Sequence, residues 1–330
     1  MNLISIDIGN GYIKAVNQAA ETLHFPTVIK PNTDKDIMGV SHNQYSIKID
    51  GQAYFIGNLA IAKRGTRQWQ SSKAVNGDTP YYLALCAHIL TPEEETHPEI
   101  GICLGLPYSY YTSLDRGAAL IKELTGKQIK TEYAGTKKEI TISHVSVYPQ
   151  GVGAYFSNLY DINGKPKKGA EDKIKALFID IGFRTVDVVA FESLNNTFEL
   201  IQENSFSLEE YGMFQAVNEV IKKTDAGIEL TANDVEFALQ NNHSKVDSMY
   251  GTTDLSSYEA EAYEQLAQQI ATLINIRLSG QIQRYKNIYL TGGGAKKLYP
   301  YISKAYPNIE IQDDCIFCNA KGYLVLESTR

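Results

Sequence analysis

Residues 3–16 read LISIDIGNGYIKAV, and residues 177–191 read LFIDIGFRTVDVVAF. Both stretches contain the letters IDIG, first at Ile6–Gly9 and again at Ile179–Gly182. In each, an apolar run ends at an aspartate, a glycine follows, and a segment of alternating polarity comes next. This order is typical of a strand, a turn and a second strand. The repeat therefore predicts that the two halves of the chain are versions of one fold.

The composition is that of an ordinary globular protein. The chain has 330 residues, of which 43% are hydrophobic and 21% charged, and this length favours two domains or lobes. No apolar run approaches the roughly 20 residues of a membrane span, and the start MNLISIDIG lacks the features of a signal peptide. We therefore expect a cytoplasmic protein without a membrane partner. The formal net charge of −7 predicts no direct nucleic-acid binding.

The cysteines predict neither a zinc site nor redox chemistry. Cys315 and Cys318 form a lone CxxC, and no second pair or nearby histidine completes a metal site. Cys103 lies in an apolar run typical of a buried strand. Reduced cysteines of the core are the favoured interpretation.

Strands and helices are interleaved along the chain, and several neighbouring strands are joined by tight turns. Helices are expected at 79–90, 114–126, 151–162, 211–224 and 257–285, near 298–305 with Pro300 in the first turn, and from about Asn319 onward. A hairpin is expected in YSIKIDGQAYFIG, with its turn at Asp50 and Gly51, and a single strand in TFELIQENSF. This pattern predicts an α/β fold with a mixed sheet in each half and helices on its faces.

The repeat also suggests where the lobes divide. Lobe I is expected to comprise residues 1–150 and 316–330, with a small inserted subdomain at about 31–75. Lobe II is expected to span residues 151–315, with a small subdomain at about 226–255. A nucleotide cleft is expected between them.

The first turn carries groups that suit a phosphate. Asp7 stands at the carboxyl end of its strand, where ligands commonly bind in α/β sheets. Gly9 and Gly11, with Asn10 between them, allow positive φ and a close approach of backbone N–H groups to an anion. The turn is neither a Walker A loop nor a dinucleotide fingerprint. Taken alone, it is as well explained as an ordinary hairpin.

The second copy changes that interpretation. Asp180 and Gly182 repeat the pattern, and Thr185 and Asp187 follow. Two such hairpins facing each other would hold one polyphosphate from both sides. Because Asp180 and Asp7 would repel each other with nothing between them, a magnesium ion bound to both through water is expected. The pair therefore predicts a magnesium–nucleotide site.

Three further features fit such a site, each with a structural alternative. Lys14 follows the first turn and would reach a phosphate, or else is a solvated strand residue. Gly292, Gly293 and Gly294 follow a buried strand and offer a flat surface to a purine or ribose, or else form a flexible turn. Gln150, between a strand and a helix, would orient an attacking water, or else caps the helix.

Together the motifs resemble the five-part nucleotide signature of the actin, heat-shock chaperone and sugar kinase superfamily. In chain order they are DIGNG, YPQGVGA, DIGFRTVD, TGGGA and FCNAKGY. Within that superfamily the chain resembles the prokaryotic actin-like proteins of the plasmid-segregating ParM type, including archaeal relatives. The segments SLEEYGMFQAVNEVIKK and LSGQIQRYKNIYLTGGGAKKL carry this closer resemblance.

The resemblance implies an actin-like ATPase fold and an ATPase, using ATP or GTP, that polymerises into filaments. Such filaments move DNA through a separate DNA-binding adaptor, so the implied partners are other copies of the chain and that adaptor. ATP or ADP with Mg²⁺ would be the cofactor. Plasmid DNA as the cargo follows from the resemblance alone.

The resemblance also implies roles for single residues. The implied catalytic set is Asp7, Gln150, Asp180 and Asp187, with Asp7 and Asp180 holding magnesium through water and Gln150 positioning the attacking water. The implied nucleotide-binding set is Gly9, Asn10, Gly11, Lys14, Gly182, Thr185, Gly212, Gly292, Gly293 and Gly294. Gly153 and Gly322 would let two connecting helices cross closely and act as a hinge. Many ParM proteins have a carboxylate where this chain has Gln150.

Two other functions use the same features. A small-molecule kinase of this superfamily would bind the same nucleotide and use Asp187 as the base. A nucleotide-binding adaptor would neither polymerise nor turn over. The sequence shows no sugar-binding pattern, and it contains Gln150 together with Asp7 and Asp180, so we favour the filament-forming ATPase.

Overall fold

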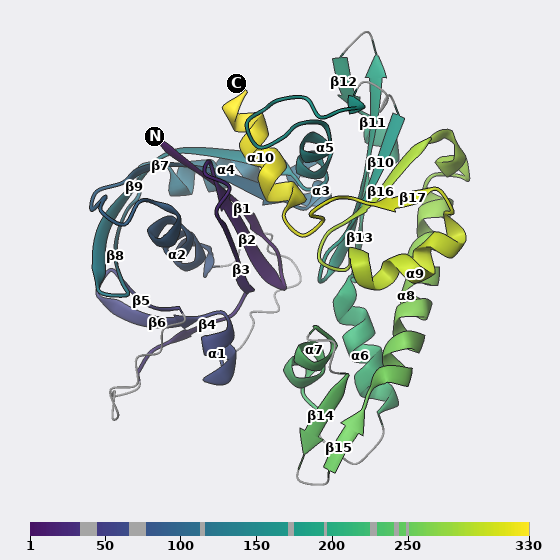
Figure 1. Cartoon of the computed structure of the whole chain (residues 1–330), viewed down its shortest axis with the longest axis horizontal. Helices are drawn as coiled ribbons and strands as arrows, with labels where there is room; N and C mark the ends of the chain where they lie inside the picture. Colours follow the sequence, from purple (N-terminus) through teal and green to yellow (C-terminus); the bar gives the residue numbers. More distant parts are fainter. Residues whose placement is uncertain are drawn as a thin grey trace. The chain divides into compact units, whose positions relative to one another are not determined.

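The computed structural model describes residues 1–33, 45–65, 77–112, 116–170, 175–194, 197–224, 230–240, 244–248 and 251–329. The chain forms two compact units, unit 1 (Met1–Glu171 and Ile316–Arg330) and unit 2 (Asp172–Cys315). Figure 1 labels their helices and strands. No helix among these described residues is both long enough and apolar enough to cross a membrane.

Unit 1 is built on a nine-stranded sheet with the order β3-β2-β1-β7-β9-β8-β5-β6-β4. Its strands are β1 (Asn2–Ile8), β2 (Tyr12–Asn17), β3 (Thr22–Pro26), β4 (Ile29–Pro31), β5 (Ser46–Ile49), β6 (Gln52–Ile56), β7 (Glu99–Leu106), β8 (Gln128–Tyr133) and β9 (Thr136–Pro149). β1 pairs antiparallel with β2 and parallel with β7. The strand that carries Asp7 is therefore held on both sides.

The core of unit 1 lies between this sheet and α2 (Thr79–Leu90), around which the sheet curls in Figure 1. The helix is apolar along most of its length, so it is buried on nearly all sides. Leu83 and Leu85 pack with strand residues such as Ile4 and Ile102 in one hydrophobic cluster. The other helices of the described part of unit 1 are α1 (Asn58–Ala62), α3 (Tyr108–Thr112), α4 (Arg116–Leu124), α5 (Val152–Leu159) and α10 (Cys318–Ser328).

α5 and α10 cross at two glycines within unit 1. A Cβ added to Gly322 would clash with the backbone of Gly153, and one added to Gly153 would clash with Asn319. Only glycines allow the helices to approach this closely. The packing places α5 in unit 1, so the boundary falls after residue 171 and not at the expected 150.

Unit 2 contains a six-stranded sheet with the order β12-β11-β10-β16-β17, in which β13 also pairs with β11. Its strands are β10 (Lys175–Ile181), β11 (Thr185–Leu194), β12 (Thr197–Leu200), β13 (Phe206–Glu209), β16 (Asn287–Thr291) and β17 (Ile309–Ile311). Its helices are α6 (Met213–Lys223), α8 (Ser256–Arg277) and α9 (Ala295–Ala305). A smaller part holds α7 (Ala232–Gln240) and the hairpin of β14 (Lys245–Ser248) and β15 (Gly251–Asp254).

The two sheets share one pattern, which confirms the prediction from the repeat that the two halves are related. β1 lies between antiparallel β2 and parallel β7, and β10 lies between antiparallel β11 and parallel β16. In each sheet a third strand, β3 or β13, then pairs antiparallel with the second one. On the other side of each sheet, β9 pairs parallel with β7, and β17 pairs parallel with β16. The halves are thus versions of one fold.

Several local predictions differ from the structure. The expected strand in TFELIQENSF is two strands, β12 and β13, separated by a short 3-10 helix at Gln202–Asn204. α8 ends at Arg277 and not near 285, because Gly280 adopts a left-handed conformation with φ 72° before another 3-10 helix, Gln281–Arg284. Pro300 lies inside α9, which begins five residues earlier than Pro300 at Ala295.

The two proposed small subdomains are only partly described. In the segment at about 31–75, the hairpin of β5 and β6 turns at Asp50 (φ 48°) and Gly51 (φ 87°), as expected, but β5 pairs with β8 and so extends the main sheet. Residues 34–44 and 66–76 lie outside the described residues. In the segment at about 226–255, α7, β14 and β15 are described, whereas residues 225–229, 241–243 and 249–250 are not.

Candidate nucleotide-binding turns

The turns after β1 and β10 have the same backbone geometry. The N–H of Gly9 donates to the carbonyl of Tyr12 at 3.1 Å, and the N–H of Gly182 donates to that of Thr185 at 2.9 Å. A Cβ added to Gly9 would lie 2.8 Å from the Tyr12 oxygen, and one added to Gly182 would lie 3.0 Å from the Thr185 oxygen. A carbonyl oxygen therefore excludes a side chain at Gly9 and leaves little room for one at Gly182.

This reason differs from the predicted one. The sequence suggested that the first turn uses positive φ, yet within the described chain neither Gly9, Asn10 nor Gly11 is among the residues with positive φ. Asn10 is exposed and Gly11 is buried. Thr27 fixes the turn from β3's end, because its hydroxyl donates to the carbonyl of Gly9 at 2.6 Å and its N–H donates to that of Gly11 at 2.9 Å. No local sequence pattern indicates the role of Thr27, since that role depends on the pairing of β2 with β3.

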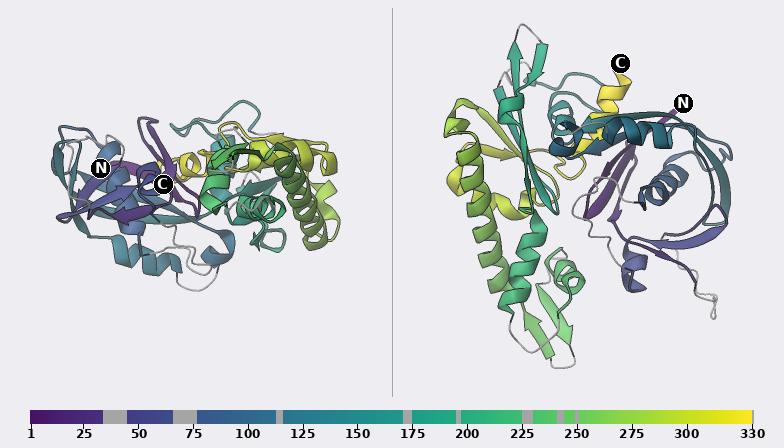
Figure 2. Two further views of the ribbon diagram at one scale, coloured as in Figure 1. Left: turned by 90° about the horizontal axis from the view of Figure 1, so that it is seen from below. Right: turned by 180° about the vertical axis from the view of Figure 1, so that it is seen from behind.

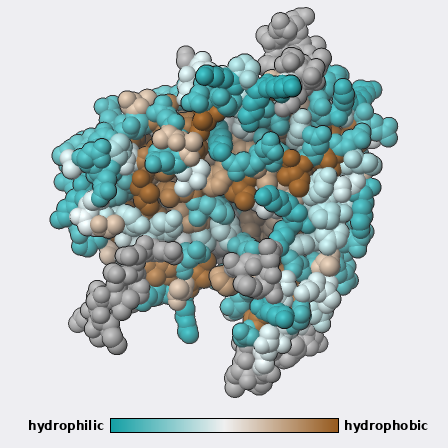
Figure 3. Space-filling model, in the orientation of Figure 1, coloured by the Kyte–Doolittle hydropathy of each residue, from teal (hydrophilic) through white to brown (hydrophobic). Residues whose placement is uncertain are grey.

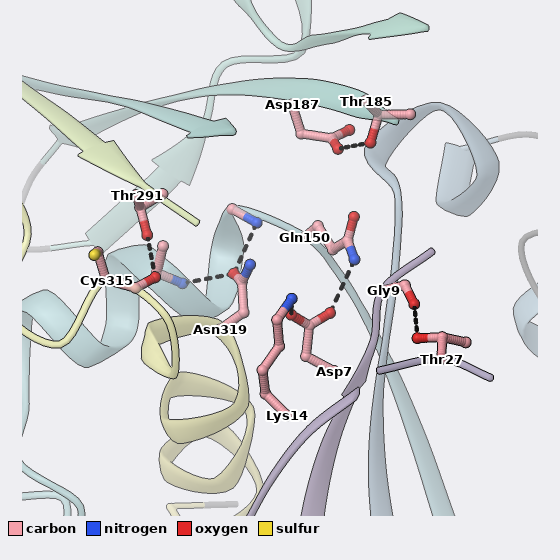
Figure 4. A network of polar contacts seen from close by, with 12 residues as sticks. Asp7, Gly9, Lys14, Thr27, Gln150, Thr185, Asp187, Thr291, Cys315 and Asn319 are labelled. Carbon is pink, nitrogen blue, oxygen red and sulfur yellow. Dashed lines mark hydrogen bonds and ion pairs between the residues drawn. The ribbon is translucent and has the colours of Figure 1, made fainter. Parts of the chain in front are cut away.

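Asp7 has a cation directly opposite it in the sheet. Asp7 on β1 is in register with Lys14 on β2, and the Lys14 ammonium lies 2.9 Å from Asp7 Oδ2. The Gln150 amide donates to Asp7 Oδ1 at 3.0 Å (Figure 4). The side chains of Lys14 and Asp7 are 11% and 5% exposed. Lys14 is therefore not a solvated strand residue, and both Asp7 oxygens have partners within unit 1.

Asp180 has a second carboxylate opposite it. Asp180 on β10 is in register with Asp187 on β11, which occupies the position that Lys14 has in the first hairpin. Asp187 accepts hydrogen bonds from the hydroxyl of Thr185 at 3.1 Å and from that of Ser207 on β13. Both aspartates are buried. Two buried carboxylates side by side favour a bound cation between or beside them.

The second hairpin fits magnesium of the kind that accompanies a nucleotide. Within the described residues there is no group of three or more histidine, cysteine, aspartate or glutamate side chains that would form a complete metal cage. Mg²⁺ is commonly held by one or two carboxylates together with phosphates and water. Asp180 and Asp187 supply that number of carboxylates. Asp7 fits less directly, because Lys14 and Gln150 already engage it.

The three glycines after β16 differ in their surroundings. Gly292 has a φ of 87°, and a Cβ there would clash with Asp180 Oδ1. A Cβ on Gly294 would meet Ile181 at 2.5 Å and Met213 at 2.7 Å, whereas one on Gly293 would have no neighbour within 4 Å. The N–H of Gly292 donates to the Cys315 carbonyl at 2.9 Å. The run is thus a held turn and not a flexible one, and Gly293 alone faces open space.

Gly212 lies against the second turn. A Cβ there would clash with the backbone of Phe183 and Arg184, and the Gly212 N–H donates to the Arg184 carbonyl at 2.9 Å. The next two N–H groups, at the start of α6, donate to the carbonyls of Gly182 and Phe183 at 3.1 and 2.8 Å. The structure therefore assigns Gly212 a packing role, which couples α6 to the turn.

Gln150 follows β9 directly but does not cap α5. The N-cap residue of α5 is Gly151, with φ 86°, and Asn319 on α10 accepts hydrogen bonds from the N–H groups of Gly151 and Ala154 at 3.0 and 3.1 Å. Asn319 thus satisfies the helix start, and the Gln150 side chain extends to Asp7 instead. Asn319 lies within the FCNAKGY motif, but the sequence does not indicate that this residue of α10 caps a different helix.

His24 continues the row formed by Asp7 on β1 and Lys14 on β2, which are opposite each other in the sheet. It lies on β3 in register with Lys14, and its ring is 4.8 Å from that of Tyr12 and 6.0 Å from that of Phe317, between centroids. Loss of water around the ring, and then the charge of Lys14, lower the pKa of His24 to about 4, while Asp7 opposes this shift. The imidazole is therefore neutral at pH 7 beside the lysine. No local sequence pattern indicates that His24 lies beside Lys14, because their neighbourhood depends on the pairing of β2 with β3.

Comparison with known proteins agrees with this arrangement. A family model described as "Actin like proteins N terminal domain" matches residues 5–153, and one described as "Archaeal actin homologue MreB-like, C-terminal" matches residues 178–304. An archaeal actin homologue of Thermoplasma volcanium is 24% identical over 339 residues, covering 98% of each chain.

Solved structures show the same fold. A 15-stranded ParM filament from Clostridium botulinum has a TM-score of 0.85 and 23% identity, covering 100% of this chain and 99% of that one. An archaeal actin homologue in complex with ADP has a TM-score of 0.78 and 20% identity, covering 100% of both chains. At these identities the likeness concerns the fold.

Proposed function

This chain belongs to the actin-like proteins, and on that premise we propose that it is a nucleotide-dependent, filament-forming ATPase. The observation that carries the proposal is the repeated hairpin. Each copy bonds a glycine N–H to the carbonyl three residues further on, and each has a buried aspartate one residue before the end of its first strand. A protein that binds no phosphate has no evident need to build this turn twice.

In this proposal the two turns, residues 9–11 and 182–185, bind phosphate oxygens of ATP or GTP through backbone N–H groups. Lys14 leaves Asp7 for a phosphate oxygen, and Gln150 orients the attacking water while bonded to Asp7. Gly293 faces the nucleoside, because a side chain there would point into open space.

The second hairpin would hold Mg²⁺, with Asp180 and Asp187 as its carboxylates and Asp7 acting through water. Bound magnesium neutralises phosphate charge during phosphoryl transfer. The residues of this chain then keep the carboxylates in place: Thr185 and Ser207 orient Asp187 by hydrogen bonds. Gly292 leaves room for Asp180, since any side chain at that position would collide with its oxygen.

The filament and its cargo belong to the same proposal. A solved relative is a ParM filament and another is an ADP complex, which supports self-association and nucleotide binding here. We infer that nucleotide turnover controls assembly in the cytoplasm. DNA, of a plasmid or of another cargo, would be reached through a DNA-binding adaptor, because the chain carries a net charge of −7.

The test is sedimentation of the purified full chain with ATP, with ADP and without nucleotide, together with phosphate release from the same tubes. The expected result is pelleting with ATP and Mg²⁺, accompanied by phosphate. EDTA is expected to remove both. Asp180→Asn serves as the variant that keeps the side-chain shape but loses the charge.

Protein that stays in the supernatant in every condition would contradict the filament function. Phosphate release that rises only with an added small-molecule acceptor would then indicate a kinase. Nucleotide binding without turnover or pelleting would indicate a nucleotide-binding adaptor.

A further inference from the structure

α6 borders a cavity of unit 2 that neither α7 nor α8 lines, although the helix packs against both, as Figure 1 and the right-hand view of Figure 2 show. The cavity has a volume of about 300 Å³, at the lower end of the range for small-molecule sites. Its wall comes from α6, from the two residues after β13 and from Arg184 of the second turn. Polar surface is ordinary, and the face of the molecule in Figure 3 is mostly hydrophilic. The order of the groups in the wall distinguishes this cavity.

The cavity is separate from the proposed nucleoside site. A Cβ on Gly294 would meet Met213 Sδ at 2.7 Å, so Met213 faces the glycine run, and it does not line the cavity. Phe214, Asn218 and Lys222 do line it, and they follow one another at four-residue steps. Such a stripe lies about 100–180° around the helix axis from Met213. The cavity and the glycine run are therefore on different sides of α6.

One end of the cavity is lined by flat groups. Tyr211 and Phe214 lie there, and the Phe214 ring is 5.5 Å from that of Phe183, between centroids. The Arg184 guanidinium lies at the same end, 13% exposed and paired with Glu210. Aromatic rings and guanidinium planes both stack on nucleobases. This end therefore suits a planar nitrogenous ring.

Two amides, Gln215 and Asn218, stand next along the cavity. Gln215 Nε2 donates to Gln269 Oε1 on α8 at 2.8 Å, whereas Gln215 Oε1 is buried and has no hydrogen-bond partner among the residues that the structure describes. A buried oxygen left without a partner is destabilising. Rotation of this amide would offer the oxygen to a donor in the cavity. Amide side chains pair with the donors and acceptors at the edge of a base.

The other end of the cavity carries a cation. Lys222 comes eight residues after Phe214, about 12 Å further along α6. Its ammonium lies 2.7 Å from Glu219 Oε1, and its side chain is 69% exposed. Such an exposed ion pair contributes little to stability. A phosphate can therefore replace Glu219 as the partner of Lys222 at small cost.

We propose that this cavity binds a nucleoside monophosphate, with its base at Phe214 and Arg184 and its phosphate at Lys222. The site is additional to the proposed ATP site, and its occupation does not require ATP hydrolysis. The N–H groups of Gly212 and Phe214 donate to the carbonyls of Arg184 and Phe183 at 2.9 and 2.8 Å, so hydrogen bonds join the cavity wall to the second turn. Each ligand is then expected to change the affinity of the other by the same factor.

The first experiment is equilibrium dialysis of the full-length chain against radiolabelled AMP or GMP. One equivalent of ADP with Mg²⁺ is present to occupy the proposed nucleotide site. The wild type is expected to bind one monophosphate per chain in addition to the ADP. The free nucleoside should compete more weakly than the monophosphate, and inorganic phosphate more weakly still. Competition by phosphate as strong as that by the monophosphate would overturn the assignment of the base.

The second experiment compares Lys222→Ala with Lys304→Ala. Lys304 on α9 is the matched control, because its side chain is 64% exposed and its ammonium lies 2.9 Å from Glu264. Lys222→Ala should weaken binding of the monophosphate about tenfold, through loss of a hydrogen bond to a charged group, and leave binding of the nucleoside unchanged. Lys304→Ala should change neither. Asn218→Trp fills the cavity and should abolish binding of both ligands while ADP still binds.

The outcomes separate this inference from the proposed function. A wild type that hydrolyses no ATP would overturn the ATPase, whereas monophosphate binding that Lys222→Ala weakens would still support the cavity site. A wild type that binds ADP but no monophosphate would overturn the cavity site alone. Equal affinities in the wild type and Asn218→Trp, or equal losses in Lys222→Ala and Lys304→Ala, would also overturn it. An ADP affinity that the monophosphate leaves unchanged would overturn the coupling to the second turn.

Discussion

The hairpins of β1–β2 and β10–β11 have one backbone and two different charge patterns. In both, an aspartate faces the residue seven positions later across the strand pair. In the first, that residue is Lys14, and the aspartate is neutralised within the protein. In the second it is Asp187, so negative charge accumulates. The same turn therefore carries a paired carboxylate and ammonium in the first hairpin and two carboxylates in the second.

This difference explains why the two halves of the chain are not interchangeable. Like charges directly opposite each other in a sheet are destabilising. Two buried carboxylates opposite each other, such as Asp180 and Asp187, are therefore expected to destabilise the folded state. A cation bound to them would offset this destabilisation. We infer that the second hairpin was kept for magnesium, and that Lys14 makes the first hairpin stable without it.

The largest effect is expected from Asp187→Asn, which removes one charge of the second hairpin. If this pair holds magnesium, phosphate release should fall roughly 100-fold or more, the size seen when one charge-stabilising group of an active site is removed. Phosphate release measured against magnesium concentration tests this expectation. The apparent magnesium affinity should weaken in the same experiment.

The matched control is Glu209→Gln on β13. Glu209 is exposed and pairs with Thr185, so this variant removes a nearby carboxylate without touching the Asp180–Asp187 row. It should retain nearly full activity. Equal losses in both variants would mean that general charge near the hairpin matters, and not the paired carboxylates.

Lys14→Met tests the first hairpin. It leaves Asp7 buried with Gln150 as its remaining hydrogen-bond donor. Removing one partner of a buried ion pair costs about 3 kcal/mol of unfolding free energy. Urea denaturation without nucleotide would measure this loss. The double variant Asp7→Asn/Lys14→Met should regain most of it, because no buried charge remains. A loss below about 0.5 kcal/mol, as for a surface substitution, would show that Lys14 does not stabilise the resting hairpin.

Gly293→Ala tests whether the nucleoside belongs beside the second hairpin. A Cβ at Gly293 meets no atom within 4 Å, so folding should be unaffected. Nucleotide binding should weaken about tenfold, or about 1.4 kcal/mol, if the base or ribose lies on this glycine. Titration with a fluorescent nucleotide measures the affinity.

Gly294→Ala gives the opposite pattern and serves as the comparison. Its Cβ would lie 2.5 Å from Ile181 and 2.7 Å from Met213, so the thermal midpoint should fall. If Gly293→Ala binds nucleotide as tightly as the wild type, the nucleoside does not contact this glycine.

The repeated hairpin was predictable because its signals are local. An apolar β-branched run, an aspartate and a glycine turn specify strand, turn and strand wherever they occur. The paired motif also predicted two related halves, and the resemblance carried by all five motifs implied the actin-like fold. The register of the strands, which places Asp7 opposite Lys14, follows from the turn length. Two short stretches of sequence therefore specify the two hairpins and the residues opposite each other in them.

The remainder depended on contacts between distant segments. Thr27, Asn319 and Ser207 hold the site residues from other strands or helices, and no spacing in the sequence connects them to their partners. The same reason explains why β5 and β6 looked like a separate subdomain. Their hairpin was visible locally, but its pairing with β8 joins residues about 80 positions apart.

The smallest expected effect concerns pH, and of the two hairpins only the first should show it. His24 continues the row of Asp7 and Lys14, whereas the corresponding neighbour of Asp187 is Ser207, which does not titrate. The residue as a whole is exposed, but its ring lies close to those of Tyr12 and Phe317. Reduced hydration of the ring and the charge of Lys14 lower its pKa to about 4.

A lowered histidine pKa favours the neutral form in the folded state. The folded protein then binds fewer protons than the unfolded chain between pH 4 and the usual value of about 6.5. The stability that His24 contributes is therefore complete above about pH 6.5 and declines as the pH falls toward 4. His88 has a pKa lowered to about 4 as well, through burial and Lys138, so the two must be resolved by NMR titration of each ring. Lys14→Met should raise the pKa of His24 and leave that of His88 unchanged. Equal shifts in both would mean that the substitution disturbs unit 1 as a whole, and not the row at the first hairpin.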